Sequence, residues 1–223
     1  MIKNKEVYDW LHFAQSYLKM GELGCAEIIG NKHIAAQLKA GYSPAYTIHD
    51  LLIPTLYNTK HGIEVFLKSL RYTLSGKIHP EHDIYSLFHT PREDVKKYKI
   101  FECLLQKSKE NPNDFNLILI KNSSNLDING FFEKIEPLVT KYYSCEFFLK
   151  KIGKTNLTFT DKNNTLFRYP DNVATARLDY ENFESGFSTN EIKDIESDIQ
   201  LLSGYFNDLG YILDIYMEYK EKE

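Results

Sequence analysis

The most regular pattern of apolar and polar positions lies near the end of the chain. Apolar residues recur there at alternating steps of three and four, which is the spacing of one helix face. They are Ile192, Ile195, Ile199, Leu202, Phe206, Leu209, Leu213 and Tyr216. Ser188 and Glu191 precede this run in the arrangement of a capping box. Because Ile212, Ile215 and Met217 widen the face beyond a coiled-coil seam, we predict a helix of about 30 residues buried within a bundle.

The stretch from Leu51 to Phe88 carries a second strong pattern. We predict one long helix from about Ala45 to Ser75, with Pro54 either kinking it or marking its first turn. The apolar stripe of this helix comprises Leu52, Leu56, Ile63, Leu67, Leu70 and Leu74. A turn at Gly76 follows, and Asp83 is placed to cap the next helix.

Glycine and proline positions set the expected ends of other elements. Gly21 and Gly24 are expected to interrupt the first helix. Pro91 fits the first turn of a later helix. Gly204 and Gly210 lie inside the last helix, where glycine is unfavourable, and close approach of a neighbouring helix would be one reason to tolerate them.

One segment has a β pattern. Residues 154–170 contain NLTFT and TLFRY, which alternate around the turn-rich tetrapeptide DKNN. We predict a β-hairpin insert that packs on the helices, because an isolated hairpin is only marginally stable. No linker-like stretch divides the chain, so residues 1–223 are expected to form one mainly α domain.

Composition narrows the classes of protein that fit. The 223 residues include 27 basic and 31 acidic ones, a net charge of −4, so nucleic acid would need a local basic patch. Three cysteines without paired spacing indicate a reducing compartment. The first residues lack a signal-peptide core, and no apolar run reaches the roughly 18 residues of a membrane span. We expect a cytoplasmic protein without membrane contact, and without metal or cofactor, since no metal-ligand spacing or phosphate loop is present.

Polar residues form a second stripe on the long helix and continue after the turn. They are His61, Glu64, Lys68, Arg71, His82 and Asp83. Two interpretations remain open: a solvated helix face with a cap at Asp83, or a cluster with cations for phosphate and a titratable histidine. In either case Glu64 and Lys68 have the favourable i,i+4 orientation of an ion pair.

Arg168 lies between two aromatic residues in the sequence FRYPDN, at the end of the expected hairpin. Its guanidinium suits bidentate pairing with a phosphate. It is equally suited to tie the hairpin to the bundle through a carboxylate such as Glu64. The first alternative adds Arg168 to the candidate binding residues His61, Glu64, Lys68 and Asp83.

These segments resemble the HEPN superfamily, the higher-eukaryote and prokaryote nucleotide-binding helical domain. The resemblance is carried by TLYNTKHGIEVFLKSLRYTLSG, by HDIYSLF and by FRYPDN, within a similarity over roughly residues 5–215. It implies an up-and-down helical bundle that often dimerises. Many relatives are metal-independent endoribonucleases of toxin–antitoxin or phage-defence systems, while others are binding modules or partners of small nucleotidyltransferases.

The family's nuclease motif, an Arg followed after four to six residues by a His, is not matched. Seven residues separate Arg71 from His79, and no His follows Arg168. We therefore expect an RNA- or nucleotide-associated protein that binds phosphate through Lys68, Arg71 and Arg168. The alternatives are a divergent endoribonuclease with Arg71 and His82 as catalytic residues, and a non-catalytic interaction subunit of an antitoxin or nucleotidyltransferase. A homodimer is expected, through the last helix or the outer face of the first helices.

Overall fold

A computed structural model describes residues 4–42, 49–77, 80, 82–114, 128–143 and 186–221. Its helices are α1 (Asn4–Gly30), α2 (Lys32–Lys39), the 3-10 turn η1 (His49–Leu51), α3 (Leu52–Ser75), α4 (Ile84–Tyr98), α5 (Ile100–Glu110), α7 (Ile128–Tyr143) and α10 (Thr189–Glu221). The described part is therefore mainly α, as the sequence predicts. The expected β-hairpin at 154–170 lies outside the described residues. None of the described helices is long and apolar enough to cross a membrane.

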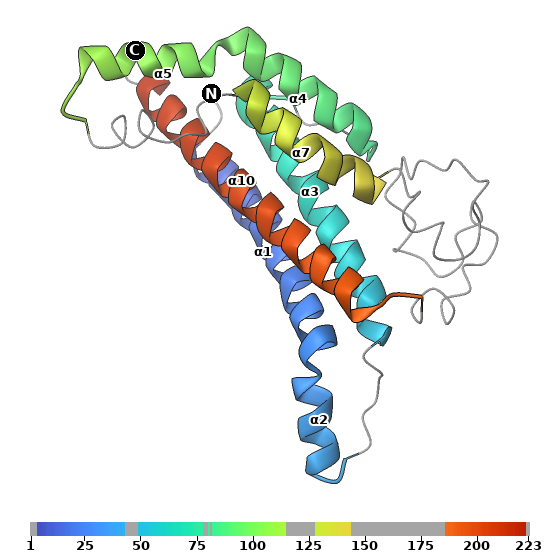
Figure 1. Ribbon diagram of the computed structural model, residues 1–223. Helices are drawn as coiled ribbons and strands as arrows, with labels where there is room; N and C mark the ends of the chain where they lie inside the picture. Colours follow the sequence, from blue (N-terminus) through green and yellow to red (C-terminus); the bar gives the residue numbers. More distant parts are fainter. Residues whose placement is uncertain are drawn as a thin grey trace.

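Three long helices form the centre of the molecule (Figure 1). α1 packs along α3 and α10, and it runs in the opposite direction to both. α4 and α7 also pack on α3, so that α3 has neighbours on several sides. α5 continues from α4 across one end of the bundle, where it meets α10.

The apolar stripe of α10 lines this core as predicted. All eight stripe residues are buried, and so are Ile212 and Ile215. Phe206 stacks on Phe66 of α3, with ring centroids 3.7 Å apart. The capping box also forms: the Ser188 N–H donates to Glu191 Oε2 at 2.9 Å, and the Glu191 N–H donates to Ser188 Oγ at 3.3 Å. The helix has 33 residues, and its local sequence provides both the cap at its first turn and the apolar face that follows.

α3 begins later than predicted, at Leu52, after the 3-10 turn. Pro54 consequently lies in the first turn, where its missing N–H would have no partner in any case. The six predicted stripe residues of α3 are buried. Gly76 ends the helix in the left-handed conformation, with φ 68°.

The prediction that Gly21 and Gly24 interrupt the first helix is wrong. α1 continues through both residues and ends at Gly30. A Cβ at Gly24 would lie 2.0 Å from Thr55 Oγ1, and one at Gly21 would lie 2.6 Å from Thr59 Oγ1. The glycines therefore permit close contact between α1 and α3.

Two further predictions about helix ends and glycines need correction. α4 continues through position 91, and the break falls instead at Lys99, whose φ is 49°. A Cβ at Gly204 would meet nothing within 4 Å, and one at Gly210 would make only an ordinary contact with Leu11, at 3.5 Å. Neither glycine of α10 is required by a close neighbour among the described residues.

Candidate functional site

Three of the predicted polar residues converge on the carboxylate of a fourth, Glu64. Glu64 Oε1 lies 2.7 Å from Lys68 Nζ and 2.6 Å from His82 Nδ1. Glu64 Oε2 lies 3.7 Å from His61 Nδ1, beyond hydrogen-bond length but within ion-pair distance if His61 is protonated. We call His61, Glu64, Lys68 and His82 the Glu64 cluster. It brings together residues that are up to 21 positions apart, from α3 and from the segment preceding α4.

The turn at Gly76 makes this convergence possible. The Gly76 N–H donates to the Tyr72 carbonyl at 2.8 Å and closes α3. His82, six positions later, contacts Glu64, which lies about three turns before the end of α3. The cluster therefore ties His82, two residues before the start of α4, to α3.

The cluster changes from buried to exposed across its members. The Glu64 side chain is 3% exposed, whereas the His82 side chain is 46% exposed. Because a carboxylate offers only acceptors, the His82 ring carries its hydrogen on Nδ1 toward Glu64. Its Nε2 is then the ring nitrogen left for solvent or a ligand. Lys68 Nζ, 3.4 Å from the same Nδ1, is held by the shared Glu64 oxygen rather than by the histidine.

His61 is positioned by aromatic rings as well as by Glu64. Tyr17 of α1 meets the imidazole edge-on, with ring centroids 4.4 Å apart. Tyr57, one turn earlier on α3, stacks on it at 5.5 Å. These contacts hold His61 between α1 and α3, which is a packing role.

Arg71 does not join the cluster through any contact within the described part of the chain. Its Nε is buried there without a hydrogen-bond partner. Its carbonyl accepts the Ser75 hydroxyl at 2.8 Å, a bond within α3. Arg168, the third predicted cation, lies outside the described residues, so a shared site of Lys68, Arg71 and Arg168 stays a prediction.

Asp83 caps α4, as the sequence predicts. Its Oδ2 accepts the Ser86 hydroxyl at 3.1 Å, and its Oδ1 accepts the Ser86 N–H at 3.4 Å. The Leu87 N–H donates to the Asp83 carbonyl at 2.9 Å, the first bond of the helix. Asp83 thereby fixes the start of α4 directly after His82.

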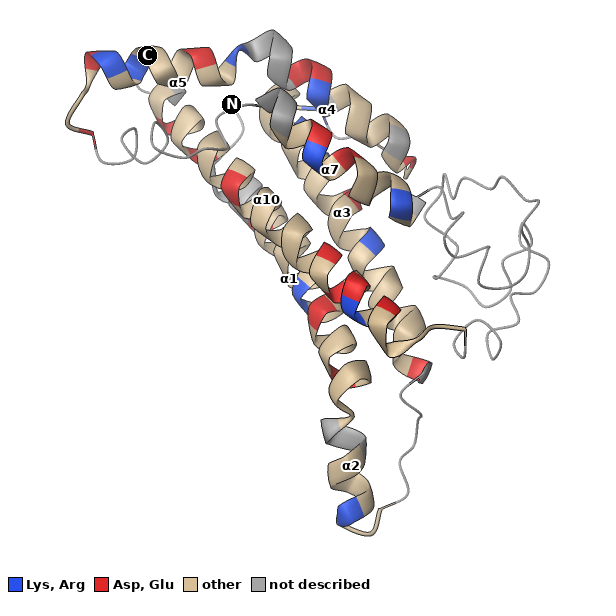
Figure 2. Ribbon diagram, in the orientation of Figure 1, with Lys and Arg blue, Asp and Glu red and all other residues tan. Residues whose placement is uncertain are grey.

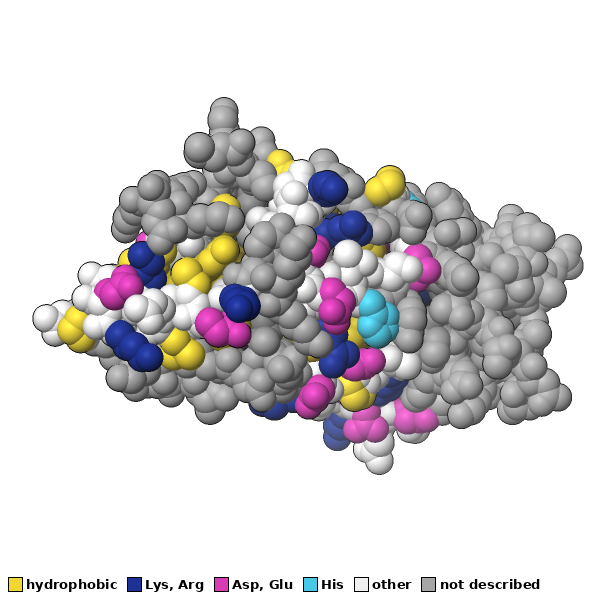
Figure 3. Space-filling model, turned by 90° about the horizontal axis from the view of Figure 1, so that it is seen from above, with side chains coloured by type: hydrophobic (Ala, Val, Ile, Leu, Met, Phe, Trp, Pro, Cys, Tyr) yellow, Lys and Arg dark blue, Asp and Glu magenta, His cyan; other side chains and the backbone are white. Residues whose placement is uncertain are grey.

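The polar stripe is therefore not a solvated helix face. The pairing of Lys68 with a nearly buried Glu64 offsets the lysine charge, so Lys68 is not a free cation for phosphate. In the view from above, basic and acidic side chains of the described residues are intermixed rather than gathered in one basic patch (Figure 3). The candidate site is accordingly small and centred on the exposed edge of His82.

Sequence reasoning missed a second polar group, between α7 and α10. Asp198 Oδ2 accepts hydrogen bonds from Lys141 Nζ at 2.5 Å and from the Tyr142 hydroxyl at 3.2 Å. Burial raises the pKa of Tyr142 well above its ordinary value, and the Asp198 charge adds to this. The available signal was an acidic residue three positions after Ile195, on the edge of the apolar stripe.

Cys25 is a free cysteine whose side chain is buried. Burial raises the pKa of Cys25 to about 12, and the charges of Glu196 and Glu22 contribute, so its thiol stays protonated. Within the described ranges, no group of three or more His, Cys, Asp and Glu side chains is arranged to hold a metal ion.

Comparison of the chain with protein-family models, with curated proteins and with solved structures found no match.

Proposed function

We propose that this protein is a HEPN-like, RNA- or nucleotide-associated helical protein without the standard nuclease spacing, and that it binds phosphate at the exposed edge of His82. The supporting observation is the 2.6 Å contact between Glu64 Oε1 and His82 Nδ1. A buried carboxylate that takes one ring nitrogen fixes both the orientation and the tautomer of the imidazole. In the protonated ring the other nitrogen, Nε2, also carries a hydrogen, and it is then placed to donate to a phosphate oxygen.

The chain as a whole is negative, with a net charge of −4, but the Glu64 cluster can become positive. Glu64 and Lys68 offset each other, so protonation of His82 adds one local positive charge. Arg71 follows Lys68 by three residues on α3, and it is the next cation along this face. One added charge therefore suits contact with a single phosphate group, either of a nucleotide or within an RNA strand.

The test uses a substitution that separates the two ring nitrogens of His82. In His82→Asn the amide nitrogen takes the place of Nδ1 toward Glu64, while Nε2 is lost. We expect binding of a labelled single-stranded RNA, measured by fluorescence anisotropy, to weaken at least about tenfold, since a hydrogen bond to a charged group contributes about 1.5–3 kcal/mol. Lys109→Asn, at an exposed residue of α5 outside the Glu64 cluster, is the control and should bind as the unaltered protein does. Equal binding by all three proteins would exclude His82 from the site.

The second candidate function is a divergent metal-independent endoribonuclease, and the same carboxylate–imidazole contact favours it. A histidine oriented by a carboxylate is suited to take a proton from an attacking 2′-hydroxyl. Arg71 would stabilise the charge that develops on the phosphate.

This candidate predicts cleavage in the presence of a chelator. A structured RNA should yield products ending in a cyclic phosphate, and both His82→Asn and Arg71→Gln should lower the rate about a hundredfold or more. Binding without any cleavage by the unaltered protein would reject the endoribonuclease and leave the binding function.

The same proposal includes a protein partner. This partner is a second copy of the chain, or a nucleotidyltransferase or antitoxin. The apolar face of α10 is buried in the bundle, so it is not available for a partner. The outer face of α1 exposes Phe13, Met20 and Leu23, which lie seven and three residues apart. Light scattering should give a dimer mass at micromolar concentration, and Met20→Glu should give a monomer. Leu38→Glu, at an exposed residue of α2, should leave the mass unchanged.

A further inference from the structure

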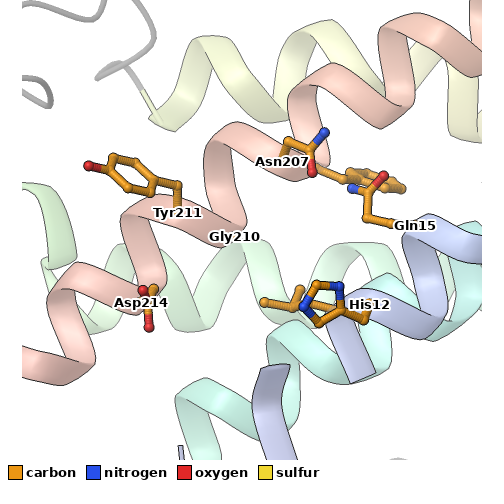
Figure 4. A pocket seen from close by; sticks show the side chains of 8 residues that line it. His12, Gln15, Asn207, Gly210, Tyr211 and Asp214 are labelled. Atoms are coloured by element: carbon orange, nitrogen blue, oxygen red, sulfur yellow. The ribbon is translucent and has the colours of Figure 1, made fainter. Parts of the chain in front are cut away.

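A pocket of about 180 Å³ lies between α1 and α10, apart from the Glu64 cluster. Leu11, His12 and Gln15 line it from α1, and Phe206, Asn207, Gly210, Tyr211 and Asp214 line it from α10. In Figure 4, Gly210 lies between Asn207 and Asp214 on α10, and His12 and Gln15 approach from α1. The pocket therefore has contributions from two helices that are more than 190 positions apart in sequence.

The inner wall of this pocket is apolar. Leu11 and Phe206 form it, and Phe206 is fixed by its stack on Phe66. Gly210 supplies no side chain, although a Cβ there would make only an ordinary 3.5 Å contact with Leu11. Helix packing does not require this glycine, and its effect is to leave room above the helix backbone. A cavity of about 150 Å³ with apolar walls is enough for one benzene ring.

The rim of the pocket is polar. Gln15 is held in place, because Ser203 Oγ donates to its Oε1 at 2.8 Å. The side chains of His12, Asn207 and Asp214 make no hydrogen bond or ion pair with another residue in the described part of the chain. Three polar side chains that can still form hydrogen bonds therefore lie around one small apolar wall.

α10, which forms one side of the pocket, is more acidic than basic. The sequence of α10 contains two lysines and eight acidic residues, and Figure 2 shows acidic positions along its length. Within the pocket, Asp214 is half-buried and carries the only carboxylate among the lining residues. A partly desolvated carboxylate favours a cation or a strong N–H donor as its partner.

We propose that this pocket binds a flat, single-ring ligand that carries a cationic N–H group, with the ring over Gly210 and the N–H donors directed to Asp214. An aromatic amidine has this chemistry. The ring would contact Leu11 and Phe206, while Asn207 and His12 lie within the same rim to meet further polar atoms. This inference does not depend on the phosphate site at His82.

The experiment uses two probes of matched shape and opposite charge, benzamidine and benzoate. Isotope-labelled full-length protein is titrated with each, and backbone amide shifts are followed by NMR. We expect saturable shifts confined to residues around Leu11 and Gly210 with millimolar benzamidine, and none with benzoate. Asp214→Asn, which keeps the shape and removes the charge, should weaken benzamidine binding about tenfold or more.

Two further variants separate the pocket from general effects. Gly210→Leu places a side chain where the ring would lie and should abolish the shifts, with circular dichroism checking that the fold is retained. Asp194→Asn, on the same helix but outside the pocket, should bind benzamidine as the unaltered protein does. Equal binding of the two probes, absence of any saturable shift, or unchanged binding by Asp214→Asn would overturn the proposal.

Discussion

α10 and α3 are both long, central helices, but they bury different kinds of surface. α10 buries one apolar face and leaves the opposite side exposed, as at Leu201. α3 is buried on nearly all sides, and its buried residues include Thr55, Thr59, Lys60, Glu64, Ser69 and Thr73. An apolar face needs only to be covered by other apolar groups, whereas a buried polar residue also needs a hydrogen-bond or ion-pair partner.

Most of these residues of α3 meet this need in two ways, whereas the buried Ser69 hydroxyl has no hydrogen-bond partner among the described residues. The threonines bond within the helix: the hydroxyls of Thr59 and Thr73 donate to the carbonyls four residues earlier, at 2.9 and 2.8 Å. Glu64 instead depends on Lys68 and on His82 from another segment. Its burial as a charged group therefore depends on the placement of His82 against α3.

The largest effect is expected in the apolar face of α10. Phe206→Ala should lower the free energy of unfolding by about 4 kcal/mol, because it removes a ring that is fully buried and stacked on Phe66. Urea denaturation followed by circular dichroism measures this. Leu201→Ala, on the exposed side of the same helix, is the control and should cost less than about 0.5 kcal/mol. Similar losses for both would contradict the assignment of the buried face.

The next effect belongs to the carboxylate of α3. Glu64→Gln should lower the unfolding free energy by about 3 kcal/mol, since it leaves the mostly buried Lys68 ammonium without its counter-charge. The matched control is Glu22→Gln, which breaks the largely exposed pair of Glu22 with Lys19 and should cost less than about 1 kcal/mol. If the two variants lose the same stability, the Glu64 cluster is not a buried network.

A third test concerns the contact that brings α1 against α3. Gly24→Ala should destabilise the protein by about 2 kcal/mol, because its methyl group would lie 2.0 Å from Thr55 Oγ1. Adding Thr55→Ala should recover part of the loss, as a double-mutant cycle measures. Gly204→Ala, whose methyl group would meet nothing within 4 Å, should instead stabilise the helix by up to about 1 kcal/mol. Destabilisation by Gly204→Ala would show that α10 has a close neighbour at that point.

These contrasts explain which elements were predictable from the sequence. The face of α10, its capping box and the Asp83 cap depend on residues close together along the chain, and all three were predicted correctly. A glycine signal is ambiguous, because Gly24 serves a close contact that only the position of Thr55 reveals. The break at Lys99 has no local signal, since lysine rarely adopts a positive φ.

The candidate site was predictable only as a set of residues. Glu64 and Lys68 are four residues apart on one helix, so their pairing follows from the local sequence alone. That His82 returns to the same oxygen depends on the turn at Gly76, and the burial of Glu64 depends on the helices around α3. The pocket at Gly210 was missed because its residues come from two helices at opposite ends of the sequence.

The smallest expected effect returns to the locally specified end of α10. Ser188→Ala should lower the unfolding free energy by about 1 kcal/mol, because it removes the hydroxyl that accepts the Glu191 N–H and donates to the Glu191 carboxylate. Thr189→Ala, at the adjacent exposed position, should change stability by less than about 0.5 kcal/mol. Hydrogen exchange at the amides of the first turn gives a second measure, and it should speed up in Ser188→Ala while exchange near Phe206 stays slow. Loss of protection along the whole of α10 would mean that the cap, rather than the buried apolar face, holds this helix in the bundle.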